Sequence, residues 1–407
     1  MTMRRGRERF RFGLTDAGKV VLRGTGFVAL AALIVPAFGA LCLLAAILLA
    51  ALVMGFLLRP RVRVEGNLPD RVITGETARL KYVLTNVGRL SAYNLRMQFT
   101  ALPEAIEQVE AGHAAVRLGP GDSIETIVAI RPTRRGCYRI GSPVCLSGFP
   151  FNLFWFGSSR GVEETLIVLP AFSRLQMPVR RLSRCGHGAG VRLAGRTGAS
   201  PEYIGSRPFM RGDSPRRIDA RAWARLAAPA TKEYDEDCDN YAALVLDTRV
   251  PAVLAKWKSK PIPELEAAVS LCASVAFTID NDCFIDLLVA GPDLHDFTAW
   301  PRAARLDRIH ELLADAAPAQ NELDDRVLPA MADRFYEMSH VIFILLRWDI
   351  TYRRLLELAG RAGCHCTVVL IGEPGSVRAD EDITMNWTGN VEVLSPEEIL
   401  SGRVKRL

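Results

Sequence analysis

The sequence predicts a multi-domain protein with an N-terminal transmembrane helical hairpin, an antiparallel β-sandwich and a C-terminal α/β domain. Three observations lead to this prediction: a long uncharged stretch near the start, short strand-like runs in the middle, and alternating strands and helices at the end. With 407 residues, the chain can hold several domains. The expected parts are 1–60, 61–172, an Arg/Gly-rich linker and motif segment at 173–240, and 241–407.

The uncharged stretch is residues 24–58, which is 35 residues without a charged side chain. About 20 apolar residues can cross a bilayer as a helix, and Pro36 and Gly39 predict a turn between two spans at 20–35 and 41–58. Positive charge dominates before the stretch, and three arginines follow it closely. Because Lys and Arg favour the cytoplasmic side, we expect both ends in the cytoplasm. The alternative is one long tilted span that would export the rest of the chain.

Residues 61–172 consist of short β-rich runs that Gly, Pro, Asn and Asp separate. Examples are RVRVEG, ARLKYVLTNVG, SIETIVAIRP and ETLIVLP. No long run has the 3.6-residue period of a helix, so a small antiparallel sandwich is expected. Residues 173–200 are rich in Gly and Arg and predict a linker or an irregular surface segment.

From residue 241 onward, strand-like and helix-like runs alternate. YAALVLD ends in Asp247, and the helical PIPELEAAVSLCASVAFTID follows it. HVIFILLRWD ends in Asp349, before the helical TYRRLLELAGRAG. This alternation predicts a mostly parallel sheet with helices on both faces. The nine cysteines form no CxxC pair, so no disulfide framework is expected.

Arginine is concentrated in the segment between the sandwich and the α/β domain. Residues 173–232 carry 12 Arg and one Lys against three acids, while the whole chain has a net charge of +6. Five acids follow within 233–239. One interpretation is a structural clamp, in which arginines pair with carboxylates, Gly212-Asp213 forms a turn, and Asp213 or Asp219 orients an arginine. The other is a basic groove for a phosphate, an anionic lipid head group or an acidic loop of a partner. We favour the clamp, and both interpretations hold if only some arginines are paired.

Several stretches resemble the family named domain of unknown function 58. RPFMRGDSPRRIDARAWAR, followed by TKEYDEDCD, is similar to the family motif Arg-x-Tyr-x-x-Gly-Asp-x-x-Arg-x-Ile-x-Trp-x-x-x-Ala-Arg, with Phe209 and Ala220 in place of the Tyr and Trp. RRGCYRIGSPVCLSGFPFNLFWF is similar to a second family segment, Arg-Gly-x-Tyr followed by Asp-Pro-Phe-Gly-Leu-Phe. The candidate anion- or partner-binding residues in the motif are Arg207, Arg211, Gly212, Asp213, Arg217, Asp219, Arg225, Lys232 and Glu233.

The resemblance implies a multi-pass protein of the bacterial inner (cytoplasmic) membrane with a von Willebrand factor A-like, Rossmann-like domain facing the cytoplasm. Such domains typically hold Mg²⁺ with Asp-x-Ser-x-Ser after the first strand. Here Arg249 and Pro251 occupy the two serine positions, and neither supplies the hard oxygen that Mg²⁺ requires. Asp247 and Asp349 are therefore expected to mark a degenerate site without metal, and Asp349 also suits a helix N-cap.

These expectations favour a non-enzymatic adaptor or scaffold that presents an A-type domain to protein partners. The resemblance implies a MoxR-type AAA+ ATPase as a partner, in the assembly or remodelling of an envelope complex. No cofactor is expected, and no recognised nucleic-acid-binding module accompanies the basic patch. Two alternatives stay open: a divalent-metal-dependent phosphoryl-transfer enzyme that uses Asp213, Asp219 and the acids of 233–239, and an anionic-lipid sensor whose arginine segment lies on the bilayer.

Overall fold

The structure is a computed structural model, and its contacts divide the chain into two compact units. The first unit is Met1–Ser173 with Trp257–Ser274 and Arg302–Ala317, and the second is Arg174–Lys256 with Val275–Pro301 and Pro318–Leu407. The structure describes residues 9–32, 38–99, 101–110, 112–159, 163–177, 202–210, 215–235, 241–250, 261–280, 284–290, 294–297, 302–319, 331, 333–372 and 389–407.

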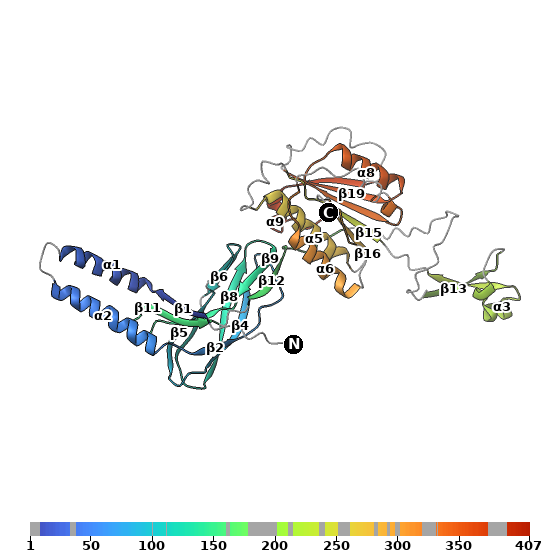
Figure 1. Ribbon diagram of the computed structural model, residues 1–407. Helices are drawn as coiled ribbons and strands as arrows, with labels where there is room; N and C mark the ends of the chain where they lie inside the picture. Colours follow the sequence, from blue (N-terminus) through green and yellow to red (C-terminus); the bar gives the residue numbers. More distant parts are fainter. Residues whose placement is uncertain are drawn as a thin grey trace. The chain divides into compact units, whose positions relative to one another are not determined.

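Two helices near the N-terminus lie side by side in the first unit (Figure 1). They are α1 (Asp16–Ala31) and α2 (Phe38–Leu57). Within the described residues, α2 is the one helix long and apolar enough to cross a membrane. The 16 residues of α1 extend about 24 Å at 1.5 Å per residue, less than the ~30 Å hydrocarbon core. The structure thus contains one candidate span where two were expected, and the expected turn, 33–37, lies outside the described residues.

The first unit also contains three β-sheets, and the antiparallel structure expected for 61–172 is confirmed. A five-stranded sheet has the order β1-β11-β10-β5-β7, a four-stranded sheet β2-β4-β8-β6, and a three-stranded sheet β3-β12-β9. Among the described residues, the strand pairs of these sheets are all antiparallel except β3 with β12. The strands are β1 (Arg9–Leu14), β2 (Val62–Glu65), β3 (Arg71–Ile73), β4 (Ala78–Asn86), β5 (Ala92–Gln98), β6 (Ile106–Glu110), β7 (Gly112–Leu118), β8 (Ser123–Pro132), β9 (Gly136–Gly141), β10 (Val144–Ser147), β11 (Phe154–Ser159) and β12 (Glu163–Leu169).

The three sheets share one hydrophobic core. Leu84 from β4, Met97 from β5, Val128 from β8 and Leu166 from β12 are all fully buried in it. Their strands alternate buried and exposed positions, as in β4, because successive side chains point to opposite faces of a sheet.

Strand β1 is an unexpected part of the first unit, because residues 1–60 were predicted to hold only a tail and the membrane hairpin. It pairs antiparallel with β11, from Arg9 opposite Ser159 to Leu14 opposite Phe154. The sequence RFRFGL does alternate Arg and Phe, which is the strand signal that could have revealed it. Both ends of the α1–α2 pair therefore continue into sheets of the same unit, through β1 and β2.

The start of α1 is fixed to the loop before β11. Thr15 is the N-cap: its hydroxyl accepts from the Gly18 N–H at 2.9 Å and donates to the Asn152 carbonyl at 2.5 Å. The Thr15 N–H also donates to the Leu153 carbonyl at 3.1 Å. Gly18 allows this close approach, because a Cβ atom there would lie 2.0 Å from the Leu153 oxygen.

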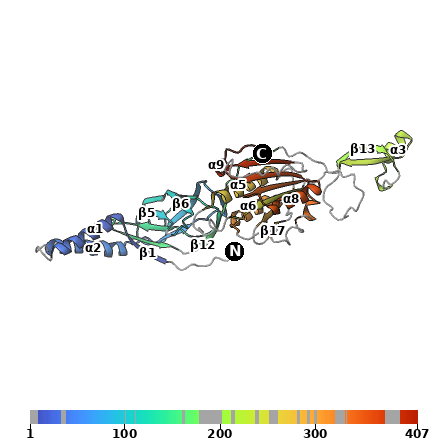
Figure 2. The ribbon, with the colours of Figure 1, turned by 90° about the horizontal axis from the view of Figure 1, so that it is seen from above.

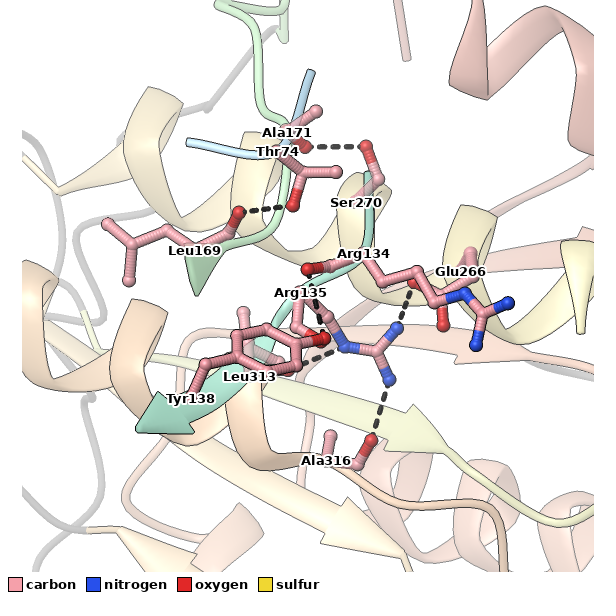
Figure 3. Close-up of polar contacts among 10 residues, drawn as sticks. All are labelled: Thr74, Arg134, Arg135, Tyr138, Leu169, Ala171, Glu266, Ser270, Leu313 and Ala316. Atoms are coloured by element: carbon pink, nitrogen blue, oxygen red, sulfur yellow. Dashed lines mark hydrogen bonds and ion pairs between the residues drawn. The ribbon is translucent and has the colours of Figure 1, made fainter. Parts of the chain in front are cut away.

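Arg135, just before β9, joins the sheets to helix α6 (Arg302–Asp315) and to the first part of helix α5 (Pro263–Ile279), which belong to the same unit as the sheets (Figure 3). Its Nε donates to the Leu313 carbonyl at 3.0 Å, and one terminal nitrogen donates to the Ala316 carbonyl at 2.6 Å. The other pairs with Glu266 of α5. Cations are stabilising at helix C-termini, where the last carbonyl groups lack hydrogen-bond partners within the helix. Arg135 therefore caps the C-terminus of α6, and its ion pair with Glu266 links α5 to the residues before β9.

The second unit contains a six-stranded sheet with the order β17-β16-β15-β18-β19-β20. All pairs are parallel except β16 with β17. Helix α8 (Ile350–Arg361) packs on β19; both are labelled in Figure 1, and Figure 2 shows α8 in a second view. The strands are β15 (Tyr241–Asp247), β16 (Phe284–Ala290), β17 (Leu294–Phe297), β18 (His340–Leu345), β19 (His365–Ile371) and β20 (Gly389–Leu394), and the short helix α9 (Pro396–Leu400) follows.

The motif segment folds locally, although it was predicted as part of a linker and motif region. Strands β13 (Glu202–Pro208) and β14 (Ala230–Asp235) form an antiparallel pair. Between them lie the short 3₁₀ helix η1 (Pro215–Arg217) and helix α3 (Ala220–Leu226). We call these four elements the α3 module; β13 and α3 are labelled in Figure 1. Residues 178–201, most of the predicted linker, lie outside the described part.

Candidate functional site

Two places in the second unit bring together the residues that the sequence singled out. The first is the Arg249 cluster, formed by Asp247, Arg249, Asp349 and Tyr352. Asp247 ends β15, and Asp349 follows the neighbouring strand β18 and begins α8. The chain continues from β15 to β16 on one side of the sheet and later to β18 on the other side. In open α/β sheets, this reversal of strand order is where ligands usually bind.

The guanidinium of Arg249 lies between the two carboxylates. Its Nε donates to Asp247 Oδ1 at 3.0 Å, and a terminal nitrogen lies 2.9 Å from Asp349 Oδ2. The ring of Tyr352 covers the guanidinium at 4.5 Å from the ring centroid. Asp247 is fully buried and Arg249 is 1% exposed. A positive charge thus occupies the space that faces both aspartates.

Asp349 is fully engaged in this arrangement. Its Oδ1 accepts from the N–H groups of Thr351 and Tyr352 at 3.0 and 3.1 Å, as an N-cap of α8. Its Oδ2 faces Arg249. The N-cap role expected for Asp349 from the sequence is therefore confirmed.

Burial and charge act in opposite directions on the Arg249 cluster. Burial raises the pKa of Asp247, although the interactions with Arg249 partly offset this. Burial alone would lower the pKa of Arg249, but interactions with Tyr352, Asp247 and Asp349 outweigh it and raise that pKa. Burial also raises the pKa of Tyr352 well above its usual value, and the Asp247 charge adds to the effect. Tyr352 therefore stays a neutral phenol at physiological pH.

The donor set of the Arg249 cluster does not fit a divalent cation. Mg²⁺ requires several oxygen ligands in near-octahedral geometry, but Asp349 uses both oxygens and Asp247 uses Oδ1 for hydrogen bonds and ion pairs within the protein. A guanidinium already stands where the metal charge would be needed. No group of three or more His, Cys, Asp or Glu residues that could hold a metal occurs within the described ranges.

The second place is the α3 module, where Asp219 organises the local fold. Asp219 is the N-cap of α3: its Oδ1 accepts from the N–H groups of Arg221 and Ala222 at 3.0 and 3.1 Å. Its Oδ2 accepts from the Ser206 hydroxyl of β13 at 2.5 Å. Because Asp219 is only 8% exposed and binds at both oxygens, its role is to fix α3 onto the strand pair.

Three cations surround an open hollow of about 700 Å³ beside α3. We call it the basic hollow; its lining residues are Ile218, Asp219, Ala220, Arg221, Ala222, Arg225 and Lys232. Arg221 and Arg225 are exposed and four residues apart on α3, so they share one face of the helix. Lys232 comes from β14. In the contacts of the described residues, none of these three side chains forms an ion pair or hydrogen bond.

The structure brings only part of the predicted motif set together. Asp219, Arg225 and Lys232 line the basic hollow, while Arg207 lies on β13. Arg217 and Glu233 lie in η1 and β14, and their side chains are outside the description. Arg211, Gly212 and Asp213 are outside the described residues, so the turn and clamp expected there stay predictions.

Arg221 and Tyr352 are the site residues that sequence reasoning missed. Arg221 could have been found from its spacing, because it precedes Arg225 by one helical turn. Tyr352 is the third residue after Asp349, and its place over Arg249 depends on a contact between residues distant in the chain. No local pattern indicates such a contact.

Comparison with known proteins provides no closer identification. No family model and no curated protein matches the chain. Among solved structures, the CARDB domain of a Pyrococcus furiosus protein is 16% identical, covers 27% of this chain and 97% of that domain, and has a TM-score of 0.17. The VesB protease of Vibrio cholerae is 13% identical over 26% of this chain and 32% of that one, with a TM-score of 0.19. A GH20 exo-β-N-acetylglucosaminidase from Vibrio harveyi is 10% identical over 77% and 57%, with a TM-score of 0.15. Similarities this weak indicate neither a shared fold nor an activity.

Proposed function

We propose that the chain is a membrane-anchored, non-enzymatic adaptor that binds protein partners through its α/β domain and its α3 module. The observation that carries this proposal is Arg249, whose guanidinium fills the space between Asp247 and Asp349 at the reversal of strand order. A crevice closed by an internal ion pair offers no open metal or acid–base pair for catalysis. Recognition by exposed surfaces is the role that this geometry favours.

The resemblance to the domain of unknown function 58 family supplies the finer parts of the proposal. The sheet order of the second unit, read in chain order as 3-2-1-4-5-6, supports a von Willebrand factor A-like, Rossmann-like domain. By the same resemblance, the proposed partner is a MoxR-type AAA+ ATPase in the assembly or remodelling of an envelope complex. The proposed location is the inner membrane, with the soluble domains in the cytoplasm.

The connections of α1 and α2 support a hairpin that crosses the membrane twice. The strand before α1 and the strand after α2 belong to the same compact unit, so both ends of the helix pair start from one side. If α2 crosses the bilayer, the chain must cross a second time to return. Helix α1 and the residues after it would supply that second crossing.

The test is binding of the full chain, solubilised in mild detergent, to a purified MoxR-type ATPase from the same genome. We expect co-elution in at least one nucleotide state among none, ADP, ATP and a non-hydrolysable ATP analogue. Absence of co-elution in all four states would overturn the ATPase partnership.

Metal titration tests the non-enzymatic part of the proposal against the phosphoryl-transfer alternative. Calorimetry of the same protein with millimolar Mg²⁺ and Mn²⁺ should give no binding heat. A saturable site, together with turnover of a phosphate ester, would overturn the non-enzymatic assignment.

A further inference from the structure

We propose that the basic hollow of the α3 module is a docking site for an acidic protein segment, one rich in Asp and Glu. This inference rests on the proposed function only in taking the ligand to be a protein. The hollow is built by one helix and one strand, and its three cations are Arg221, Arg225 and Lys232.

The internal carboxylate of the hollow does not neutralise these cations. Asp219 is buried beneath them and binds the α3 backbone and Ser206. Like charges four residues apart on a helix repel each other, so the guanidinium groups of Arg221 and Arg225 disfavour each other. An incoming carboxylate would remove this repulsion and form charge-assisted hydrogen bonds with both guanidinium groups.

The shape and lining of the hollow favour a protein segment over other anions. A volume of about 700 Å³ is far larger than one phosphate and can take several side chains. Ile218, Ala220 and Ala222 add apolar wall for the methylene groups of glutamate. Among the lining residues that the structure describes, none has an aromatic ring on which a nucleic-acid base could stack. A bilayer surface is flat on this scale and would not enter a hollow.

The experiment measures binding of fluorescent peptides to the full chain in detergent. The probe is a Glu/Asp-rich peptide, and its control is the same peptide with Gln and Asn in place of the acids. We expect the acidic peptide alone to bind, with affinity that falls as salt is added. Arg221→Glu and Arg225→Glu should each weaken binding about tenfold or more, as expected when a close charge pair is reversed.

Arg216→Glu is the matched control, because Arg216 is an exposed cation of the same module that does not line the hollow. It should change the affinity by no more than about twofold, since exposed charges outside a contact matter little. Equal losses for Arg216→Glu and Arg225→Glu would overturn the proposal and indicate a general charge effect. Equal binding of the amide peptide would overturn it as well.

Two further probes identify other ligands. If inorganic phosphate or vesicles containing phosphatidylglycerol displace the acidic peptide at lower concentration than free peptide does, the hollow is an anion or lipid site and the proposal is wrong. Failure of the docking proposal can be distinguished from failure of the adaptor proposal. If the ATPase co-elutes equally with wild type and Arg225→Glu while the peptide does not bind, the docking proposal fails and the adaptor stands.

Discussion

Arg249 binds Asp247 twice, because its backbone N–H and its Nε each donate to Asp247 Oδ1 at 3.0 Å. The two residues are separated by one position and are both almost completely buried. A buried carboxylate is costly unless a counter-charge, either from the protein or from a bound cation, compensates it. Here the chain supplies that counter-charge itself from the second residue after the aspartate.

Replacing Arg249 with methionine should strongly destabilise the second unit. The substitution leaves Asp247 buried without a counter-charge, and breaking a buried ion pair costs about 3–5 kcal/mol. Adding Asp247→Asn to Arg249→Met should recover part of the loss, because the uncompensated charge is gone. Urea unfolding of the wild type and the two variants measures both effects. A double variant no more stable than Arg249→Met would show that charge compensation is not the cause.

The sequence pointed to Asp247, Arg249 and Asp349 of the Arg249 cluster, but neither to Tyr352 nor to the arrangement of the four residues. Asp247 and Asp349 were placed at strand ends because apolar runs stop there, and such runs depend only on neighbouring residues. The sequence also showed that Arg249 replaces a metal-ligand serine. It could not show that the guanidinium turns inward to bridge both aspartates, since this depends on how β15 and β18 pair. The same limit concealed the pairing of β1, because its partner β11 lies about 145 residues away in the chain, although the local alternation of Arg and Phe could have revealed the strand itself.

Arg135→Ala should loosen the end of α6. The variant loses the hydrogen bonds to the Leu313 and Ala316 carbonyls and leaves the partly exposed Glu266 without its cation, and we expect a cost of about 1–3 kcal/mol. Arg135→Lys should be intermediate, because lysine keeps the charge but not the planar fork. Hydrogen–deuterium exchange of the last turn of α6 should speed up in both variants.

Arg134→Ala is the control for this prediction, because the neighbouring guanidinium in Figure 3 carries none of these contacts. It should change stability by less than about 0.5 kcal/mol. Unchanged exchange in Arg135→Ala would show that α6 does not depend on this cap.

Gly18→Ala should destabilise the joint between α1 and the loop before β11. The new methyl group would lie 2.0 Å from the Leu153 carbonyl oxygen, which belongs to the backbone and cannot turn aside. Overpacking of this kind costs about 1–3 kcal/mol.

Gly24→Ala in the same helix is the control, because a Cβ there meets nothing within 4 Å. Alanine is the better helix former, so Gly24→Ala should be neutral or stabilising. Scanning fluorimetry in detergent compares the melting temperatures, and equal values for the two variants would contradict the contact.

The reactivity of each cysteine thiol should depend on whether the thiol is buried or exposed, and not on activation by a catalytic group. Burial raises the pKa of Cys145 and of Cys272 to about 12, so both stay protonated and unreactive in the folded protein. Cys137 is exposed and should be alkylated before Cys145 and Cys272. Mass spectrometry of protein treated with iodoacetamide at pH 8 measures the extent of alkylation of each cysteine separately. Rapid native alkylation of Cys272 would mean that α5 opens readily.

The raised pKa values of Cys145 and Cys272 predict that the free energy of unfolding decreases at alkaline pH. In the unfolded chain these thiols ionise near their ordinary pKa of 9.0, whereas in the folded protein they ionise only at about 12. Because the folded pKa is the higher one, the stabilisation is complete below pH 9 and is lost as the pH rises toward 12. The free energy of unfolding should therefore fall across this alkaline range. Cys272→Ala should fall less steeply than wild type, although its cavity lowers stability at every pH. Parallel slopes for the two proteins would contradict a contribution from Cys272.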